Sequence, residues 1–122
     1  MPKPLRWFSR QFAHRTVDFV LTCKEMTPAL KGHLGYSEET SDGRVTVWIC
    51  AASPRDVQDV TALHEALHVA AWDLNIDEEV EEIAFSAAEP VWPVLVSCGL
   101  KWPRRPKGAA ELERWSRKKD KR

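Results

Sequence analysis

Residues 44–74, with the sequence RVTVWICAASPRDVQDVTALHEALHVAAWDL, contain a strand pattern followed directly by a long helical pattern. Over residues 44–50, β-branched and aromatic side chains alternate, which predicts a strand with one buried face. Ser53 is a suitable N-cap and Pro54 a suitable first helical residue, so we expect a helix that ends near residue 73. Apolar side chains at helical spacing should pack this helix against the sheet; they are Val60, Leu63, Leu67, Ala70 and Leu74.

The segments around this stretch supply the rest of a small domain. Residues 16–23, TVDFVLTC, form a short β-branched and aromatic run that predicts a strand. Residues 34–38 should pair with residues 44–50 as a hairpin, because Asp42-Gly43 suits a tight turn that needs positive φ. A second helix is predicted from about residue 78 to residue 89, where a proline ends it. These elements indicate an α+β fold in which a small antiparallel sheet packs on two helices.

The chain is of single-domain size, and its opposite charges are unevenly distributed. It has 122 residues, 43% of them hydrophobic, and a formal net charge of zero, which argues against attraction of the whole molecule to nucleic acid or to an anionic membrane. Residues 1–100 contain 8 basic and 15 acidic side chains, whereas residues 101–122 contain 10 basic and 3 acidic ones. We therefore expect one domain over residues 1–103 and a basic C-terminal tail over residues 104–122.

Several features indicate a protein of the cytoplasm. No stretch approaches the roughly 20 apolar residues of a membrane-spanning helix, so no membrane partner is expected. Residues 1–16 are basic but lack the apolar core of a signal peptide, and residues 1–15 are expected to form a flexible basic arm. The three cysteines are far apart and form no CxxC pair, which favours reduced thiols over a disulfide framework or a zinc knuckle.

The motif HExxH, at residues 64–68 in the middle of the predicted first helix, carries the clearest chemical signal. His64 and His68 are one helical turn apart on the same face, so both imidazoles can bind a single Zn²⁺ ion. Glu65 lies beside them and can act as the general base that takes a proton from zinc-activated water. This spacing therefore predicts a zinc site with catalytic chemistry.

A catalytic zinc also needs a third protein ligand, and the acidic run at residues 77–82 offers candidates on the next helix. On a helical wheel Glu82 points more to solvent, whereas Glu81 borders an apolar arc made of Val80, Ile83, Ala84, Ala87 and Ala88. Glu81 is therefore the favoured third ligand. Glu82, Asp77 and a more distant acid remain the alternatives.

Around these residues the chain resembles a zincin, in particular a minimal gluzincin, whose ligand set is His, His and Glu. Residues 62–84, ALHEALHVAAWDLNIDEEVEEIA, resemble short metallopeptidases encoded by bacteriophages and prophages, in which a V-E-x-I/L-A pattern follows the HExxH helix. Residues 80–84 match that pattern, which again favours Glu81 as a ligand. A looser similarity exists to cytoplasmic metallopeptidases that cleave prophage repressors.

The resemblance covers about residues 44–98 and implies a zinc metallopeptidase with Zn²⁺ held by His64, His68 and Glu81. It implies a protein or peptide substrate, bound as an extended strand along the sheet edge, and a host-cytoplasmic location for a phage-encoded protein. The Met-turn and the third histidine of metzincins are absent. Residues that can be considered for transition-state stabilisation, although each is more often a packing or surface residue, are His14, His33 and Tyr36.

Two features leave a different function open. The zinc site can belong to a non-catalytic, zinc-stabilised binding protein, since no residue is assigned to transition-state stabilisation. The basic tail at residues 104–122, with Trp115 in it and Trp102 just before it, can contact nucleic acid or an acidic protein, or can be a solvated end with no partner. The sequence predicts no oligomeric state.

Overall fold

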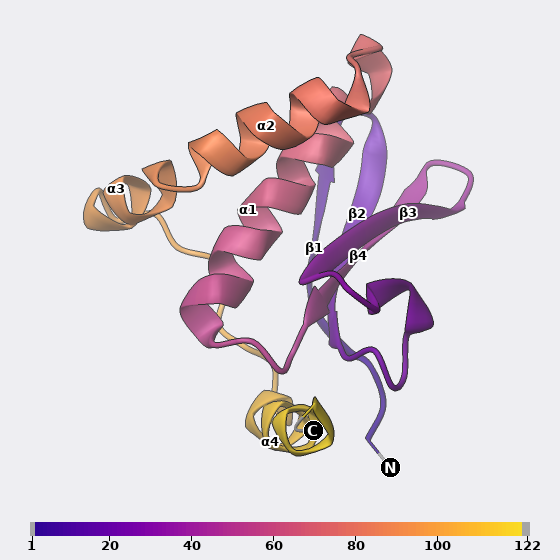
Figure 1. Ribbon diagram of the computed structural model, residues 1–122, viewed down its shortest axis with the longest axis vertical. Coiled ribbons are helices and arrows are strands. Elements are labelled where there is room, and N and C mark those ends of the chain that lie inside the picture. The colour runs from indigo at the N-terminus through magenta and orange to yellow at the C-terminus, as the bar shows by residue number, and fades with distance from the viewer. Residues whose placement is uncertain (1, 121–122) are drawn as a thin grey trace.

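The computed structural model describes residues 2–120 and shows an α+β fold with a four-stranded sheet and four helices (Figure 1). Helix α1 crosses one face of the sheet, and α2 and α3 lie on the side of α1 that faces away from the sheet. Helix α4 lies at the end of the molecule where α1 begins. In chain order the elements are β1 (Leu5–Phe12), β2 (Arg15–Thr22), η1 (Pro28–Leu30), β3 (Gly35–Ser41), β4 (Arg44–Cys50), α1 (Arg55–Ala71), η2 (Trp72–Leu74), α2 (Glu78–Ala88), α3 (Val91–Ser97) and α4 (Ala109–Asp120).

The sheet is mixed, with strand order β1-β2-β4-β3, so the prediction of an antiparallel sheet is wrong for one pair. The predicted β3–β4 hairpin is confirmed, and so is the strand β2. However, β2 and β4 run parallel, with Val17 beside Val45 and Leu21 beside Ile49. The connection after β2 carries the chain through η1 to the far edge of the sheet, so the hairpin returns with β4 in the same direction as β2.

Strand β1 replaces the flexible basic arm that was expected at residues 1–15. It pairs antiparallel with β2, and the pairing register shifts between Arg6 and Phe8. Through this irregularity two consecutive aromatic residues, Trp7 and Phe8, are both buried, at 6% and 7% exposure. The resulting pattern lacks the strict alternation of polar and apolar residues that marks a strand in a sequence. The segment was therefore interpreted from its basic residues alone, as a flexible arm.

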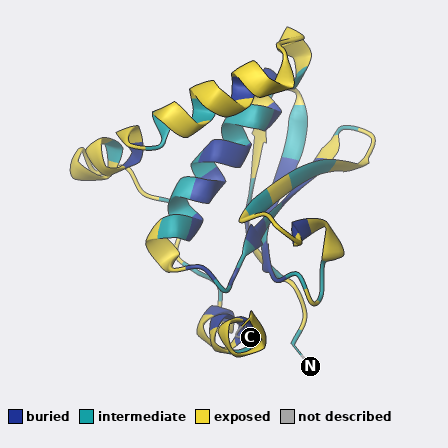
Figure 2. Ribbon diagram, in the orientation of Figure 1, coloured by how far each residue is buried: buried dark blue, intermediate teal, exposed yellow. Residues whose placement is uncertain are grey.

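Helix α1 packs on the sheet through a different face from the one predicted. The sheet face beneath it is apolar and fully buried around Phe19 and Val47. Of the predicted stripe, Ala70 and Leu74 are exposed. The buried positions of α1, the dark blue segments in Figure 2, are largely polar: Gln58, Thr61, Ala62, His64, Glu65, Val69 and Ala71. The spacing of apolar residues predicted the wrong face because polar groups such as Gln58 and Glu65 can be buried when other elements supply their hydrogen bonds. Such partners cannot be recognised from the periodicity of the helix alone.

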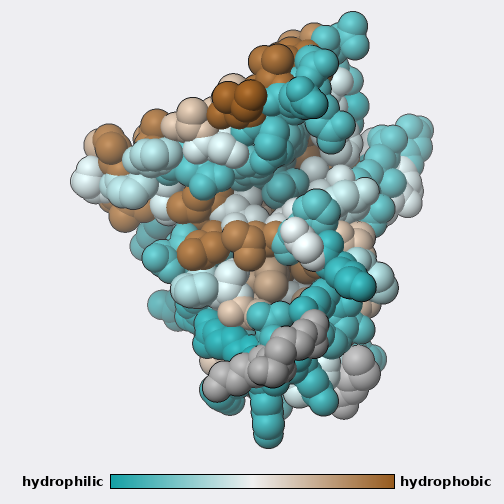
Figure 3. All heavy atoms as spheres, in the orientation of Figure 1, coloured by the Kyte–Doolittle hydropathy of each residue, from teal (hydrophilic) through white to brown (hydrophobic). Residues whose placement is uncertain are grey.

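Helix α2 confirms the predicted second helix, but its apolar arc is not buried. Val80 is 56% exposed and Ile83 is 72% exposed, whereas Glu81 is only 9% exposed. Figure 3 accordingly shows hydrophobic side chains on the outer surface along α2 and α3. The helix turns its acidic face inward because that face meets the histidines of α1. Among residues 2–120, no helix combines the length and the apolar character needed to cross a bilayer.

The predicted basic tail at residues 104–122 includes helix α4, which packs against the start of α1. Leu112 and Glu113 are buried, at 2% and 3% exposure. The Glu113 carboxylate accepts hydrogen bonds from Arg55, at 2.8 Å, and from the Gln58 amide, at 2.9 Å. Burial by itself would raise the pKa of Glu113, but these donors outweigh it and hold the pKa below its usual value of 4.5. The stabilisation is therefore present above that value and is lost as the pH falls through the lower folded-state pKa.

Replacing Glu113 by alanine should lower the free energy of unfolding by about 2 kcal/mol, because the buried Gln58 amide and Arg55 lose a charged acceptor. Urea denaturation followed by tryptophan fluorescence measures this change. The control is Asp120→Ala, which removes the exposed Lys24–Asp120 ion pair from the same helix and should cost less than about 0.5 kcal/mol. Equal effects of the two variants would contradict the anchoring role of Glu113.

Candidate metal centre

Helix α1 presents the two histidines of HExxH on one face, with their Nε2 atoms converging. The Nε2 atoms of His64 and His68 are 3.1 Å apart, and the ring centroids are 4.8 Å apart. Both side chains are largely shielded from solvent, at 10% and 14% exposure. The helix supplies this arrangement because positions four residues apart are neighbours on its surface.

Glu82 of α2 completes the convergence. One of its carboxylate oxygens lies 2.9 Å from His64 Nε2, and the other lies 3.0 Å from His68 Nε2. The three side chains together form a group whose ligand atoms all lie within 4.8 Å of one another. Two imidazole nitrogens and one carboxylate are a donor set that zinc uses in catalytic sites, and ligand atoms about 2 Å from a common ion are separated by about 3 Å. The residues therefore fit a divalent transition metal such as Zn²⁺.

The opposite nitrogens of both histidines meet two further carboxylates. His68 Nδ1 lies 3.0 Å from Glu81 Oε1, and His64 Nδ1 lies 3.0 Å from Glu89 Oε2. A carboxylate that accepts from Nδ1–H selects the tautomer whose Nε2 lone pair is free for a metal. Glu81 of α2 therefore orients His68, and Glu89, the residue that follows α2, orients His64.

The structure thus separates the predicted third-ligand candidates. It brings Glu82 to the Nε2 atoms, whereas the favoured residue Glu81 lies behind His68, and Asp77 caps α2 by accepting from Glu79 N at 2.9 Å. The helical wheel favoured Glu81 because it assumed that the apolar arc of α2 is buried. Glu89 was not predicted, although its spacing of seven residues from Glu82 places both acids on one helical face.

Glu65 lies beside the histidines as the motif predicts, and it is held by the edge strand β3. It is 9% exposed, and its Oε1 accepts a hydrogen bond of 3.0 Å from Ser37 Oγ. Burial raises the pKa of Glu65 above its usual value, although Ser37 and the two histidines counteract part of the effect. A carboxylate whose pKa is raised toward neutrality is suited to act as a general base.

Strand β3 can approach Glu65 because residue 35 is glycine. A Cβ atom at Gly35 would lie 2.5 Å from Thr61 Cγ2 and 3.0 Å from Glu65 Cγ. Those distances are shorter than packed carbon atoms tolerate. The close contact between β3 and α1 therefore depends on the missing side chain, and it places Ser37, two residues further along β3, beside the Glu65 carboxylate.

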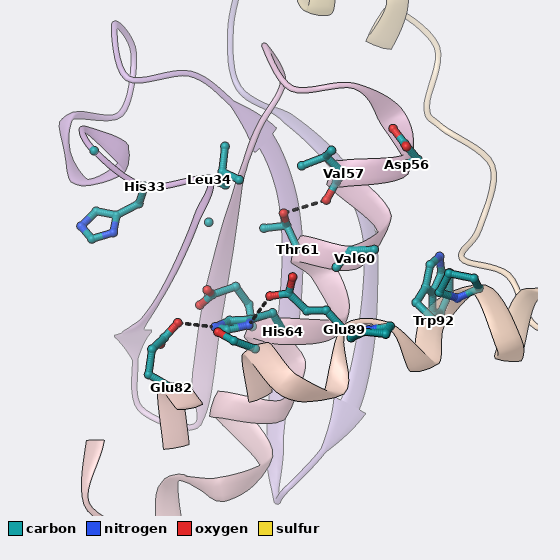
Figure 4. Close-up of a pocket in the computed structure, with 16 residues that line it drawn as sticks. His33, Leu34, Asp56, Val57, Val60, Thr61, His64, Glu82, Glu89 and Trp92 are labelled. Carbon is teal, nitrogen blue, oxygen red and sulfur yellow. Dashed lines mark hydrogen bonds and ion pairs between the residues drawn. The ribbon is translucent and has the colours of Figure 1, made fainter. Parts of the chain in front are cut away.

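His64, Glu65 and Glu82 line a cleft of about 920 Å³ between α1, the start of β3 and the α2–α3 pair (Figure 4), whereas His68 lies outside its lining. Its apolar walls include Leu34, Val57 and Val60, and its lining contains four carboxylates but neither lysine nor arginine. These acids are Asp56, Glu65, Glu82 and Glu89. The cleft therefore combines a metal-ligating group with an acidic and apolar channel.

Of the residues considered for transition-state stabilisation, His33 lines this cleft, on the wall opposite α1. Tyr36 is 38% exposed, and its ring centroid lies 6.1 Å from that of His33. His14 lies in the turn between β1 and β2, where it adopts a positive φ of 62°. Only His33 of the three is thus among the residues that line the cleft.

Comparisons of the chain with protein-family models, curated proteins and solved structures found no match. No related structure therefore bears on the zincin-like fold that the resemblance implies. Any inference about the chemistry of the site must therefore be drawn from its geometry. This geometry consists of the converging ligand atoms of His64, His68 and Glu82, the carboxylates of Glu81 and Glu89 at the Nδ1 atoms, and the buried Glu65.

Zinc affinity separates the roles of the two adjacent acids. Glu82→Ala should weaken zinc binding by more than about 100-fold because it removes a ligand, whereas Glu81→Ala should weaken it by about 10-fold because it removes only the partner of His68 Nδ1. Competition with a chromophoric chelator measures both, on protein without a histidine tag. Glu79→Ala, an exposed acid of the same helical turn, is the control. A larger loss for Glu81→Ala than for Glu82→Ala would reverse the assignment.

Zinc binding should also weaken on acidification. Burial opposes protonation of His68, but Glu81, Glu65 and Glu82 outweigh it and raise the pKa of His68 above 6.5. Because the metal competes with this proton, affinity should already fall as the pH approaches 6.5 from above. The same competition assay at a series of pH values tests the expectation, and an affinity unchanged between about pH 8 and pH 6 would contradict it.

Gly35→Ala should destabilise the protein by about 1–3 kcal/mol, because the added methyl group forces β3 away from α1. Thermal unfolding measures the loss. Ser41→Ala, at the other, exposed end of β3, is the matched control and should have little effect. A fully stable Gly35→Ala protein would show that the approach of β3 to α1 is not constrained by this position.

Proposed function

We propose that the protein is a zinc-dependent metallopeptidase. The observation that carries this proposal is the convergence of His64 Nε2, His68 Nε2 and the Glu82 carboxylate beside a cleft that His64, Glu82 and the buried Glu65 line. A structural zinc site is usually closed by four protein ligands, whereas a catalytic one has three and leaves a position open. The ligand set among the described residues has three members, and two of them, His64 and Glu82, line the cleft.

Each side chain has a chemical role in this proposal. His64, His68 and Glu82 would hold the ion, and Glu81 and Glu89 would keep the two imidazoles in the required tautomer. When bound, zinc supplies a Lewis acid that activates water and polarises a carbonyl group. Glu65 accepts the proton of the attacking water and passes it to the amine that leaves. Ser37 holds the Glu65 carboxylate in place for both transfers.

The cleft fits an extended peptide. Its lining runs along α1 from Asp56 to Glu65, a rise of about 14 Å, which matches about four residues of extended chain. Strand β3 pairs with β4 and forms the sheet edge at this side, so a peptide can add to it as a further strand. Because the lining carries four carboxylates, basic and apolar peptides should bind better than acidic ones.

The test is the Glu65→Gln variant, assayed on an unfolded, fluorescently labelled protein substrate after zinc loading. The variant should keep one zinc per chain and lose about 10²–10⁴-fold in cleavage rate, because glutamine cannot accept the proton. Glu78→Gln, which changes an exposed acid of α2, should cleave at the wild-type rate.

Cleavage by Glu65→Gln at the wild-type rate would contradict the mechanism and indicate a contaminating protease. Zinc-loaded, folded wild-type protein that cleaves none of the labelled substrates would instead favour the alternative of a non-catalytic, zinc-stabilised binding protein. The position of α2 is compatible with that alternative, since Glu81 is its one buried residue and Glu81 and Glu82 form its hydrogen bonds and ion pairs with the histidines of α1.

A further inference from the structure

Two basic segments from opposite ends of the sequence lie together in the fold. Residues 2–15 contain four basic side chains and residues 101–110 contain four, and neither segment contains an acid. Trp7 Nε1 donates a hydrogen bond of 2.9 Å to the Pro103 carbonyl, and the rings of Phe8 and Trp102 stack at 5.3 Å. The aromatic residues of β1 therefore fasten the 101–105 segment along this edge strand of the sheet.

A second cleft, of about 630 Å³, lies where these segments meet the start of α1. Its lining contains five basic side chains and no acid. The lining residues are Arg10, Arg55, Lys101, Trp102, Pro103, Arg104 and Arg105. It is separate from the metal centre, whose cleft has the opposite charge.

The five cations divide into two kinds. Arg55 pairs with Glu113 and Arg105 pairs with Asp59, so their charges are already balanced within the protein. Arg10, Lys101 and Arg104 are exposed and have no carboxylate partner among residues 2–120. A net positive charge therefore faces solvent in this cleft, and an anionic ligand can reach it.

We propose that this cleft binds the phosphate backbone of a nucleic acid. Two of the three unpaired cations, Arg10 and Arg104, are arginines, whose fork of donors matches phosphate oxygens. The Trp102 ring already stacks with Phe8 and Trp92, so the cleft offers little of the free aromatic surface that anchors protein partners. The site overlaps the predicted basic tail of residues 104–122 only at Arg104 and Arg105; its other residues come from β1, the start of α1 and residues 101–103, and none comes from helix α4.

Fluorescence anisotropy with a labelled double-stranded DNA of about 20 base pairs tests this proposal, because duplex DNA presents phosphates without requiring base stacking on the protein. The variant Arg10→Gln/Lys101→Gln/Arg104→Gln removes the three exposed charges from the cleft. The matched control, Arg114→Gln/Lys118→Gln/Lys119→Gln, removes three exposed charges from α4 and leaves the cleft intact. Circular dichroism should verify that both variants are folded.

The cleft variant should lose at least about 10-fold in affinity near 50 mM salt, and its dependence on salt should become shallower by about two to three counterions. The control should bind within about twofold of the wild type. Equal losses in the two variants, or no DNA binding by the wild type, would overturn the proposal. Competition by polyglutamate as effective as that by unlabelled DNA would also overturn it, in favour of an acidic protein partner. These outcomes do not depend on peptidase activity, so the two proposals fail separately.

Discussion

Helix α1 packs on the sheet through a face that is largely polar, and three other elements, α4, β3 and α2, supply hydrogen-bonding partners for its polar groups. A buried polar group without a hydrogen bond costs about 1–3 kcal/mol, so such a face is stable only when each group is satisfied. The Gln58 amide donates hydrogen bonds to the Ser53 carbonyl and to Glu113 of α4, and Glu65 accepts one from Ser37 of β3. Helix α4 and strand β3 therefore contact α1 at its buried polar groups and provide the hydrogen bonds that make their burial stable.

The same requirement positions the metal centre. His64 and His68 lie at the border of the buried face, and α2 turns its acidic side toward them instead of its apolar side. Val80 and Ile83 are left exposed as a consequence. Contacts between these acids and the two histidines thus decide the orientation of α2, which apolar burial alone would have rotated by roughly half a turn. The resulting charge distribution is asymmetric: an acidic cleft is lined by His64, Glu65 and Glu82, and a separate basic cleft lies beside β1.

Much of the fold could be predicted from local patterns. The Asp42-Gly43 turn, the strands on either side of it and the helices α1 and α2 all follow from residue types within short windows. Strand β1 could not be predicted in this way, because its pairing irregularity buries Trp7 and Phe8 together. The parallel pairing of β2 with β4 was also missed, since strand direction depends on the path of the whole connection rather than on either strand.

For the candidate site, the sequence by itself determined the two histidines and the neighbouring Glu65, because four-residue spacing on one helix is a local geometric fact. Tertiary structure alone decided which acid meets which nitrogen: Glu82 at both Nε2 atoms, Glu81 and Glu89 at the Nδ1 atoms. It likewise decided that Gly35 admits β3 and that two distant basic segments share one cleft. These arrangements arise from packing between elements far apart in the chain, and a one-dimensional pattern does not encode the rotation of one helix against another.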